Sequence, residues 1–197
     1  MANRIRAVNV DNHRLDPHET ELRVHVWVDE LTPTTEIKGR LMGPRCVYRS
    51  TVEVAYPMRP VGQDAESRHV ELRVIIPEAC WWEPKTPFLY QGPLELWQDG
   101  VLCERRDLSH AISNFNFQVG ANGWENNGRP YALRGKAVDL SFDETQARQW
   151  HDDGINTLLT RVATSQSGSD LNALADRFGF FVMDADGFAW LSQTESK

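Results

Sequence analysis

Apolar and polar residues alternate with a period of two over much of the first 130 residues of this 197-residue chain. Successive side chains of a β-strand point to opposite faces of a sheet, so the alternation predicts strands with one face on a core and one in water. Shorter runs of the same kind occupy 52–56, 70–76 and 115–119. The clearest run places Leu22, Val24, Val26 and Val28 between Arg23, His25, Trp27 and Asp29.

Turn residues separate these runs and join two of them into a hairpin. The step Asp99-Gly100 lies between apolar runs at 94–97 and 101–103, and its residue types suit the positive φ angles of a tight hairpin turn. Six or seven short strands with turns between them predict an antiparallel β-sandwich of immunoglobulin type. This prediction concerns architecture only, because the paired cysteines and core tryptophan of antibody domains are not evident in the sequence.

The pattern changes after about residue 131 to alternating strands and helices. Apolar segments at 132–138, 155–159 and 180–183 are predicted strands, and the segments between them are predicted helices. This order implies parallel pairing through right-handed crossovers, a βαβαβ segment. We therefore predict a mainly β protein with an α/β C-terminal part, divided into a sandwich domain at 1–130 and a βαβαβ domain at 131–197.

The ends of the two helices carry recognisable signals. Ser141 and Glu144 have the spacing of a capping box, which predicts that Ser141 caps the first helix. Gly154 is expected to end that helix and Gly179 the second, because glycine readily adopts the left-handed conformation found after a helix.

Composition and charge exclude several classes of protein. No apolar run is long enough to span a bilayer, and no secretory signal is seen at the start, so a cytoplasmic location is expected. The formal net charge of −7 disfavours a nucleic-acid-binding surface. Cys46, Cys80 and Cys103 form neither a disulfide framework nor a zinc motif, and no cofactor or metal is predicted.

Four segments resemble glycoside hydrolase family 2, the group of β-galactosidases and β-glucuronidases. Residues 80–90, CWWEPKTPFLY, are similar to the family's LWSPExPxLY segment, and 127–135, NGRPYALRG, are similar to its NGKPVxLRG entry into the first barrel strand. Residues 153–157 resemble the xGxN opening of the second strand, and 176–184 resemble the DxxGxxVxDE segment leading into the third. The resemblance covers about residues 70–190 and implies an immunoglobulin-like domain followed by the first part of a TIM barrel.

The strand ends depart from the family pattern. The family places polar, substrate-facing residues at these ends, including Asn and His after the first strand and Arg and His after the second. Here these polar residues are replaced or displaced, at Ala137, Asp139, Leu159, Arg161, Val162, Ala185 and Asp186. The resemblance also implies two catalytic glutamates, one after the fourth and one after the seventh barrel strand. This chain is predicted to contain three barrel strands.

These departures predict a non-catalytic family 2-like protein or fragment with a structural or interaction role and weak carbohydrate binding. The alternative is the N-terminal part of a complete β-glycosidase whose catalytic glutamates lie outside this chain. No catalytic residue is assigned in either case, and the sugar specificity is not predicted.

Four charged residues at the expected carboxyl ends of strands are candidates for substrate binding: Asp139, Arg161, Asp184 and Asp186. The aspartates can serve acid–base chemistry or bind a divalent cation, or they can simply cap the following helices. Arg161 can hold an acidic sugar through its planar guanidinium, or it can be a solvated loop residue.

Three aromatic residues and one edge of the parallel sheet are predicted to be covered by other parts of the protein or by a partner. Trp81, Trp82 and Tyr90 are expected to pack the sandwich core or its junction with the barrel rather than to stack on a sugar. Three parallel strands leave an apolar edge near 180–183, and this edge needs cover. A second copy of the chain or the missing barrel portion is the expected partner.

Overall fold

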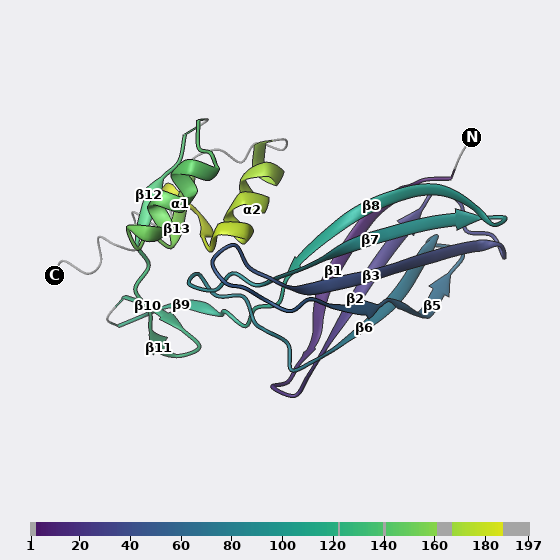
Figure 1. Cartoon of the computed structure of the whole chain (residues 1–197), viewed down its shortest axis with the longest axis horizontal. Coiled ribbons are helices and arrows are strands. Elements are labelled where there is room, and N and C mark those ends of the chain that lie inside the picture. The colour runs from purple at the N-terminus through teal and green to yellow at the C-terminus, as the bar shows by residue number, and fades with distance from the viewer. Residues whose placement is uncertain (1–2, 122, 140, 161–166, 187–197) are drawn as a thin grey trace. The chain divides into compact units, whose positions relative to one another are not determined.

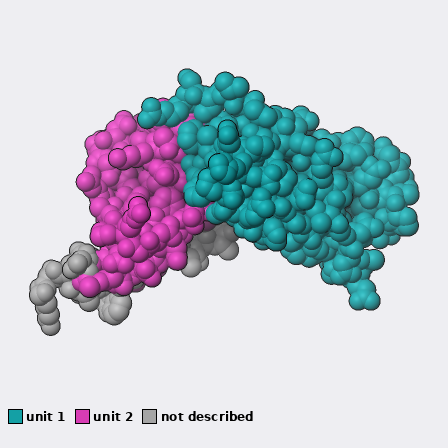
Figure 2. Space-filling view, turned by 90° about the horizontal axis from the view of Figure 1, so that it is seen from below, with its two compact units in different colours: residues 1–45, 49–81, 88–112 teal, residues 46–48, 82–87, 113–197 magenta. Residues whose placement is uncertain are grey.

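The computed structural model describes residues 3–121, 123–139, 141–160 and 167–186. These residues form two compact units (Figures 1 and 2). The first comprises residues 1–45, 49–81 and 88–112, and the second comprises 46–48, 82–87 and 113–197. The units are defined by contacts, and the predicted domain division after residue 130 stays a prediction.

The first unit is a sandwich of two antiparallel four-stranded sheets, as the sequence predicts (Figure 1). One sheet has the order β1-β2-β6-β5, with strands Ile5–Leu15, Glu19–Val28, His69–Pro77 and Arg59–Asp64. The other has the order β4-β3-β7-β8, with strands Val54–Pro57, Thr35–Arg45, Leu89–Gln98 and Val101–Ala111.

Alternation along the strands builds the core of this sandwich. The apolar residues of β2 are fully buried and the residues between them are half-buried. Asp99 and Gly100 have φ angles of 51° and 75°, which confirms the tight turn between β7 and β8. The three aromatic side chains that were predicted to pack are packed in the structure. Trp81 lies against the sandwich core, Trp82 is 4% exposed and Tyr90 is 1% exposed.

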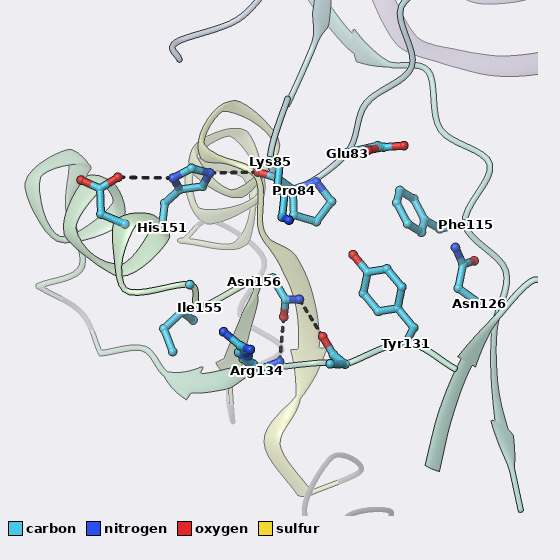
Figure 3. Close-up of a pocket in the computed structure, with 13 residues that line it drawn as sticks. Glu83, Pro84, Lys85, Phe115, Asn126, Tyr131, Arg134, His151, Ile155 and Asn156 are labelled. Carbon is cyan, nitrogen blue, oxygen red and sulfur yellow. Dashed lines mark hydrogen bonds and ion pairs between the residues drawn. The ribbon is translucent and has the colours of Figure 1, made fainter. Parts of the chain in front are cut away.

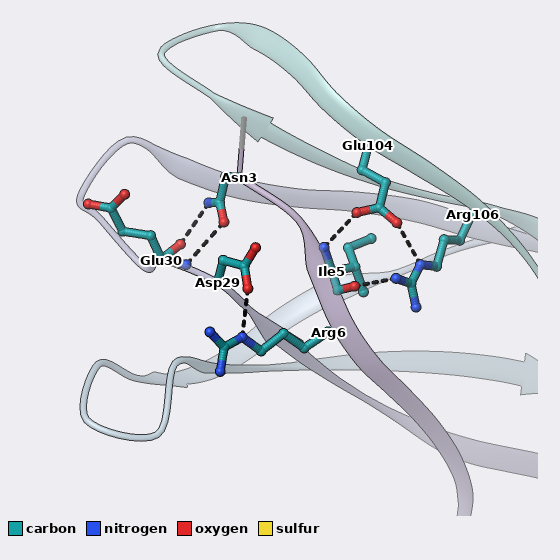
Figure 4. A network of polar contacts seen from close by, with 7 residues as sticks. All are labelled: Asn3, Ile5, Arg6, Asp29, Glu30, Glu104 and Arg106. Atoms are coloured by element: carbon teal, nitrogen blue, oxygen red, sulfur yellow. Dashed lines mark hydrogen bonds and ion pairs between the residues drawn. The ribbon is translucent and has the colours of Figure 1, made fainter. Parts of the chain in front are cut away.

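Polar contacts fix the start of β1 to β8, a strand of the opposite sheet (Figure 4). The Glu104 carboxylate accepts hydrogen bonds from Ile5 N and Arg106 Nε, both at 2.7 Å, and the Arg106 guanidinium also donates to Ile5 O. Burial alone would raise the pKa of Glu104, but these hydrogen bonds outweigh it and hold the pKa below its usual range. The network therefore joins the two layers at their edge through a charged group.

Residues 115–119 do not extend the sandwich, contrary to the expectation from their alternation. Strand β9 (Phe117–Gly120) pairs with β10 (Gly123–Asn126), which pairs with β11 (Arg129–Pro130) in a separate three-stranded sheet. The pattern of period two predicts a strand correctly, but it does not specify which sheet the strand joins.

The second unit also contains the predicted βαβαβ segment. Its strands β12 (Gly135–Ala137), β13 (Thr157–Thr160) and β14 (Phe181–Asp184) are parallel and lie in the order β12-β13-β14. Helices α1 (Glu144–Asp152) and α2 (Ser167–Phe178) connect them. A small core lies among these elements, formed by Ala147, Trp150, Leu158, Ala175, Phe178 and Phe180.

The first helix begins two residues later than predicted. Asp143, not Ser141, is the N-cap, and its side chain accepts a hydrogen bond from Gln146 N at 2.9 Å. Ser141 instead donates its hydroxyl to Asp139. Aspartate is an equally good cap, and an acidic residue also favours the positive end of the helix dipole. The predicted helix ends are confirmed, with Gly154 and Gly179 at φ angles of 79° and 80°.

Two short segments from the first half of the sequence belong to the second unit. Trp82 Nε1 donates a hydrogen bond to Asp176 O at 2.7 Å, and the Tyr48 hydroxyl donates to Phe178 O at 3.3 Å. Both acceptors lie on α2, so the segments 46–48 and 82–87 pack onto the helical layer. Neither α1 nor α2, the helices of the described residues, has the length and apolar character needed to cross a membrane.

Candidate functional site

Asn156 connects the beginnings of two parallel strands. Its Oδ1 accepts a hydrogen bond from Arg134 N at 2.7 Å, and its Nδ2 donates to Ala132 O at 2.9 Å. One amide side chain thereby satisfies a donor and an acceptor of the extended segment that leads into β12. This contact gives a structural reason for the asparagine in the segment 153–157 that resembles the family's xGxN opening.

Gly154 leaves room beside this connection. A Cβ atom at this position would lie 2.9 Å from Arg134 Nη1, and the positive φ angle already disfavours other residues. The glycine therefore both ends α1 and leaves space for the Arg134 guanidinium.

His151 anchors the C-terminal end of α1 to two other segments. Its ring stacks on Tyr48 with the ring centroids 3.9 Å apart, and its Nε2 lies 3.1 Å from Pro84 O. A carbonyl oxygen only accepts, so Nε2 carries the proton in this contact. The Asp152 carboxylate lies 3.6 Å from Nδ1. Burial raises the pKa of Tyr48 from its usual value of about 10 to about 12.

An aromatic cluster covers the residue that begins β14. The Phe181 ring makes edge contacts with the rings of Trp82, Phe115, Phe117 and Tyr131, with centroids 4.8–6.1 Å apart. Edge-to-face pairs of this kind are attractive and directional. The hairpin β9–β10 and the 82–87 segment thus hold the side chains at the start of the parallel strands in place.

A cavity of about 790 Å³ lies beside this cluster, within the second unit (Figure 3). Its walls come from the 83–85 segment, from Phe115 and Asn126, from Tyr131, Ala132 and Arg134, and from the last two residues of α1 together with the loop between α1 and β13. The last two of these segments immediately precede β12 and β13. The cavity therefore lies at the amino ends of the parallel strands.

The predicted site residues lie at the opposite ends of the same strands. Asp139 follows β12, Asp184 ends β14, and Asp186 lies two residues farther on. Asp139 Oδ1 accepts hydrogen bonds from the Ser141 hydroxyl and Ser141 N, and these bonds lower the pKa of the exposed Asp139 carboxyl. Asp184 Oδ1 accepts from Asp186 N at 2.9 Å.

These local turns do not decide whether the carboxylates contact a substrate, so that assignment stays a prediction. Arg161 lies outside the described residues. In the part of the chain that the structure describes, no group of three or more His, Cys, Asp or Glu side chains is placed to hold a metal ion.

The sequence did not predict a binding role for the residues that line the cavity. Three of them lie in the segment NGRPYALRG and three in CWWEPKTPFLY, so the sequence points to both segments but not to a cavity between them. The missing information was the packing of the 82–87 segment against the parallel strands. Nothing in the periodicity of either segment indicates that contact.

Comparison with known proteins gives matches at the level of structure only. No family model matches the sequence, and no curated protein matches it. Among solved structures, a glycosyl hydrolase family 2 member from Bacteroides cellulosilyticus superposes with a TM-score of 0.62 at 19% identity, covering 90% of this chain and 24% of that one.

Two further structures give the same picture. A Bifidobacterium dentium β-glucuronidase complexed with coumarin-3-O-glucuronide has a TM-score of 0.64 at 16% identity, covering 93% of this chain and 31% of that one. An exo-chitosanase from Amycolatopsis orientalis has a TM-score of 0.61 at 18% identity, covering 93% and 22%. The resemblance to glycoside hydrolase family 2 is thus confirmed as a likeness of fold, and this chain spans about a quarter to a third of the length of these structures.

Proposed function

We propose that this chain is a non-catalytic scaffold of glycoside hydrolase family 2 type, in which the sandwich precedes the opening βαβαβ of a (β/α)8 barrel. The observation that supports this most strongly is the parallel sheet β12-β13-β14, whose two outer strands have no further neighbour among the described residues. Parallel sheets are normally buried on both faces, and a closed barrel has no free edges. The role of the segment is to present its sheet to further strands.

The chemistry of glycoside hydrolysis supports a non-catalytic role for the isolated chain. Most glycosidases use two carboxyl groups on either side of the scissile bond. The resembled family carries both on strands beyond the third, and the described residues form three parallel strands. Asp139, which follows β12, and Asp184, which ends β14, instead accept local hydrogen bonds.

An activity assay tests this proposal directly. The purified chain, incubated with a panel of chromogenic β-glycosides, is expected to release no more chromophore than buffer does. Turnover that persists through successive purification steps and follows the protein peak would refute the non-catalytic role.

The same proposal predicts a partner at the edges of the parallel sheet, either a second copy of the chain or further barrel strands. Backbone groups of β12 and β14 have no strand partner on their outer sides among the described residues, and such edges favour association. Light scattering coupled to size exclusion is expected to show a dimer or larger species. A monomer of 22.5 kDa with a cooperative melt would instead indicate that the chain covers its own edges.

A second candidate function is the N-terminal part of a complete β-glycosidase. The observation favouring it is that the chain spans only 22–31% of the length of three neighbours whose fold it shares. The genomic sequence after the codon of Lys197 separates the two candidates. An open reading frame that encodes a fourth strand followed by Asn-Glu supports the complete enzyme, whereas a stop codon supports the scaffold.

A further inference from the structure

The cavity at the amino ends of β12 and β13 has the size of a ligand-binding site, which the proposed scaffold role does not explain. Its volume of about 790 Å³ is within the range of small-molecule sites. TIM-barrel active sites lie at the carboxyl ends of the strands, so this cavity is at the other end of the sheet. It is therefore separate from the position at which a family 2 barrel would carry out its chemistry.

One wall of the cavity is aromatic and is held rigidly. Phe115 and Tyr131 line it, and their rings pack edge to face with each other and with Phe181. Rings fixed by such neighbours can accept an apolar ligand surface without losing much conformational freedom. Pro84 and Ile155 extend the apolar lining.

Three donors at the cavity have no hydrogen bond or ion pair with any other described residue. They are the Lys85 ammonium, the Arg134 guanidinium and the Tyr131 hydroxyl (Figure 3). Asn156, by contrast, uses its amide to join backbone segments. In Figure 3, Lys85 and Arg134 lie on opposite sides of Asn156, and the Tyr131 hydroxyl points toward the space between them. These donors are available to a ligand.

Acidic groups balance the cations at the same cavity. Glu83 and Asp152 are lining residues, equal in number to Lys85 and Arg134. Burial raises the pKa of Tyr131, and the charge of Glu83 raises it further. The Glu83 carboxylate therefore interacts electrostatically with the Tyr131 hydroxyl. A ligand of either charge would be attracted by one of these pairs and repelled by the other, so the lining favours no net charge on the ligand.

A neutral ligand with many hydroxyl groups suits this balanced lining. A hydroxyl both donates and accepts, so one such ligand can donate to Glu83 and accept from Lys85 and Arg134. The carbon-bound hydrogens of a sugar ring provide an apolar face for Tyr131. We propose that the cavity formed by Glu83, Lys85, Tyr131 and Arg134 is a non-catalytic binding site for a neutral saccharide.

Nuclear magnetic resonance titration of the full chain tests the proposal. Cellobiose and D-glucose are the neutral probes, and D-glucuronate and glucose 6-phosphate are the anionic ones. The neutral sugars are expected to give saturable shifts of the amides near Tyr131 and Arg134. Absence of a saturable shift there with either neutral sugar, or shifts with the anions alone, would overturn the proposal.

Matched variants assign the binding to the cavity. Lys85→Met and Arg134→Met are each expected to weaken neutral-sugar binding at least about fivefold, the effect of losing one hydrogen bond. Arg129→Met is the control, because Arg129 is exposed on β11 and is not among the lining residues. Equal affinities for all three variants would refute the assignment.

A fourth variant, Tyr131→Phe, guards against unfolding. If the spectrum of Arg134→Met loses its dispersion, Tyr131→Phe removes only a hydroxyl and is expected to weaken binding with the fold intact. Failure of this proposal is distinguishable from failure of the scaffold role, since turnover of chromogenic glycosides overturns only the latter.

Discussion

Replacement of Gly179 by alanine is expected to be one of the most destabilising single changes in the second unit. Gly179 follows α2 with a φ angle of 80°, and a Cβ atom there would lie 2.1 Å from Pro84 O, a backbone atom. The left-handed conformation costs a residue other than glycine about 1–2 kcal/mol. The clash adds to this, because the carbonyl must move or α2 must shift.

Pro84 O is also the acceptor for His151 Nε2. Displacing the carbonyl therefore breaks a further hydrogen bond, with a net contribution of about 1 kcal/mol. Together, the conformational cost, the clash and the lost hydrogen bond predict that Gly179→Ala lowers the free energy of unfolding by at least about 3 kcal/mol.

Gly128→Ala provides the matched control. Gly128 has a similar φ angle of 73°, and nothing lies within 4 Å of a Cβ atom built there. Only the conformational cost of about 1–2 kcal/mol is expected. Urea denaturation at pH 7, followed by tryptophan fluorescence, measures both variants. Equal losses for the two would show that the contact between Gly179 and Pro84 does not constrain the fold.

Three further changes test the electrostatics. Burial lowers the pKa of His110 from its usual value to about 4. As the pH decreases from 6.5 to 4, the unfolded chain takes up the proton first, and the free energy of unfolding falls by up to about 3 kcal/mol. A pKa near 6.5 for this imidazole, measured by nuclear magnetic resonance, would contradict the prediction. Glu104→Gln is expected to cost about 1–3 kcal/mol in urea denaturation at pH 7, since the neutral amide no longer pairs with the Arg106 charge. Tyr48→Phe is expected to cost about 1 kcal/mol, because it loses the hydrogen bond to Phe178 O. Between pH 10 and 12 the Tyr48 hydroxyl ionises first in the unfolded chain, which lowers the stability of the protein, and the variant is expected to lack this loss. An unchanged alkaline denaturation curve for this variant would contradict the assigned pKa.

Local sequence patterns predicted where the strands and helices lie better than they predicted which strands pair with each other. The alternation in β2, the Asp99-Gly100 turn and the helix-ending glycines each depend on residues close in sequence, and all are confirmed. The sheet that β9 joins depends on packing against distant residues, and the prediction for it was wrong. The start of α1 was also wrong, because Ser141 and Asp143 are both good caps and the spacing to Glu144 alone favoured the former.

The cavity was missed for the same reason that β9 was misplaced. Its walls come from segments separated by up to about seventy residues, and they meet because Trp82 and Pro84 contact the helical layer. Conversely, the aspartates predicted to bind substrate were proposed from their positions at strand ends alone, and their role stays a prediction. Position at a strand end is a local property, whereas a binding site is a property of several segments together.

The sizes of the two cores give an independent reason to expect a partner for the parallel sheet. Among the described residues, sixteen buried apolar side chains form the core of the sandwich, and six form that of the βαβαβ layer. Full burial of a large apolar side chain contributes about 1.5–3 kcal/mol, which the loss of conformational entropy largely offsets. The parallel layer thus has less than half as many buried apolar side chains as the sandwich. Additional strands on the outer sides of β12 and β14 would increase its burial and satisfy its backbone groups at the same time. The same two edges thus connect the small core of this layer with its proposed role as a scaffold.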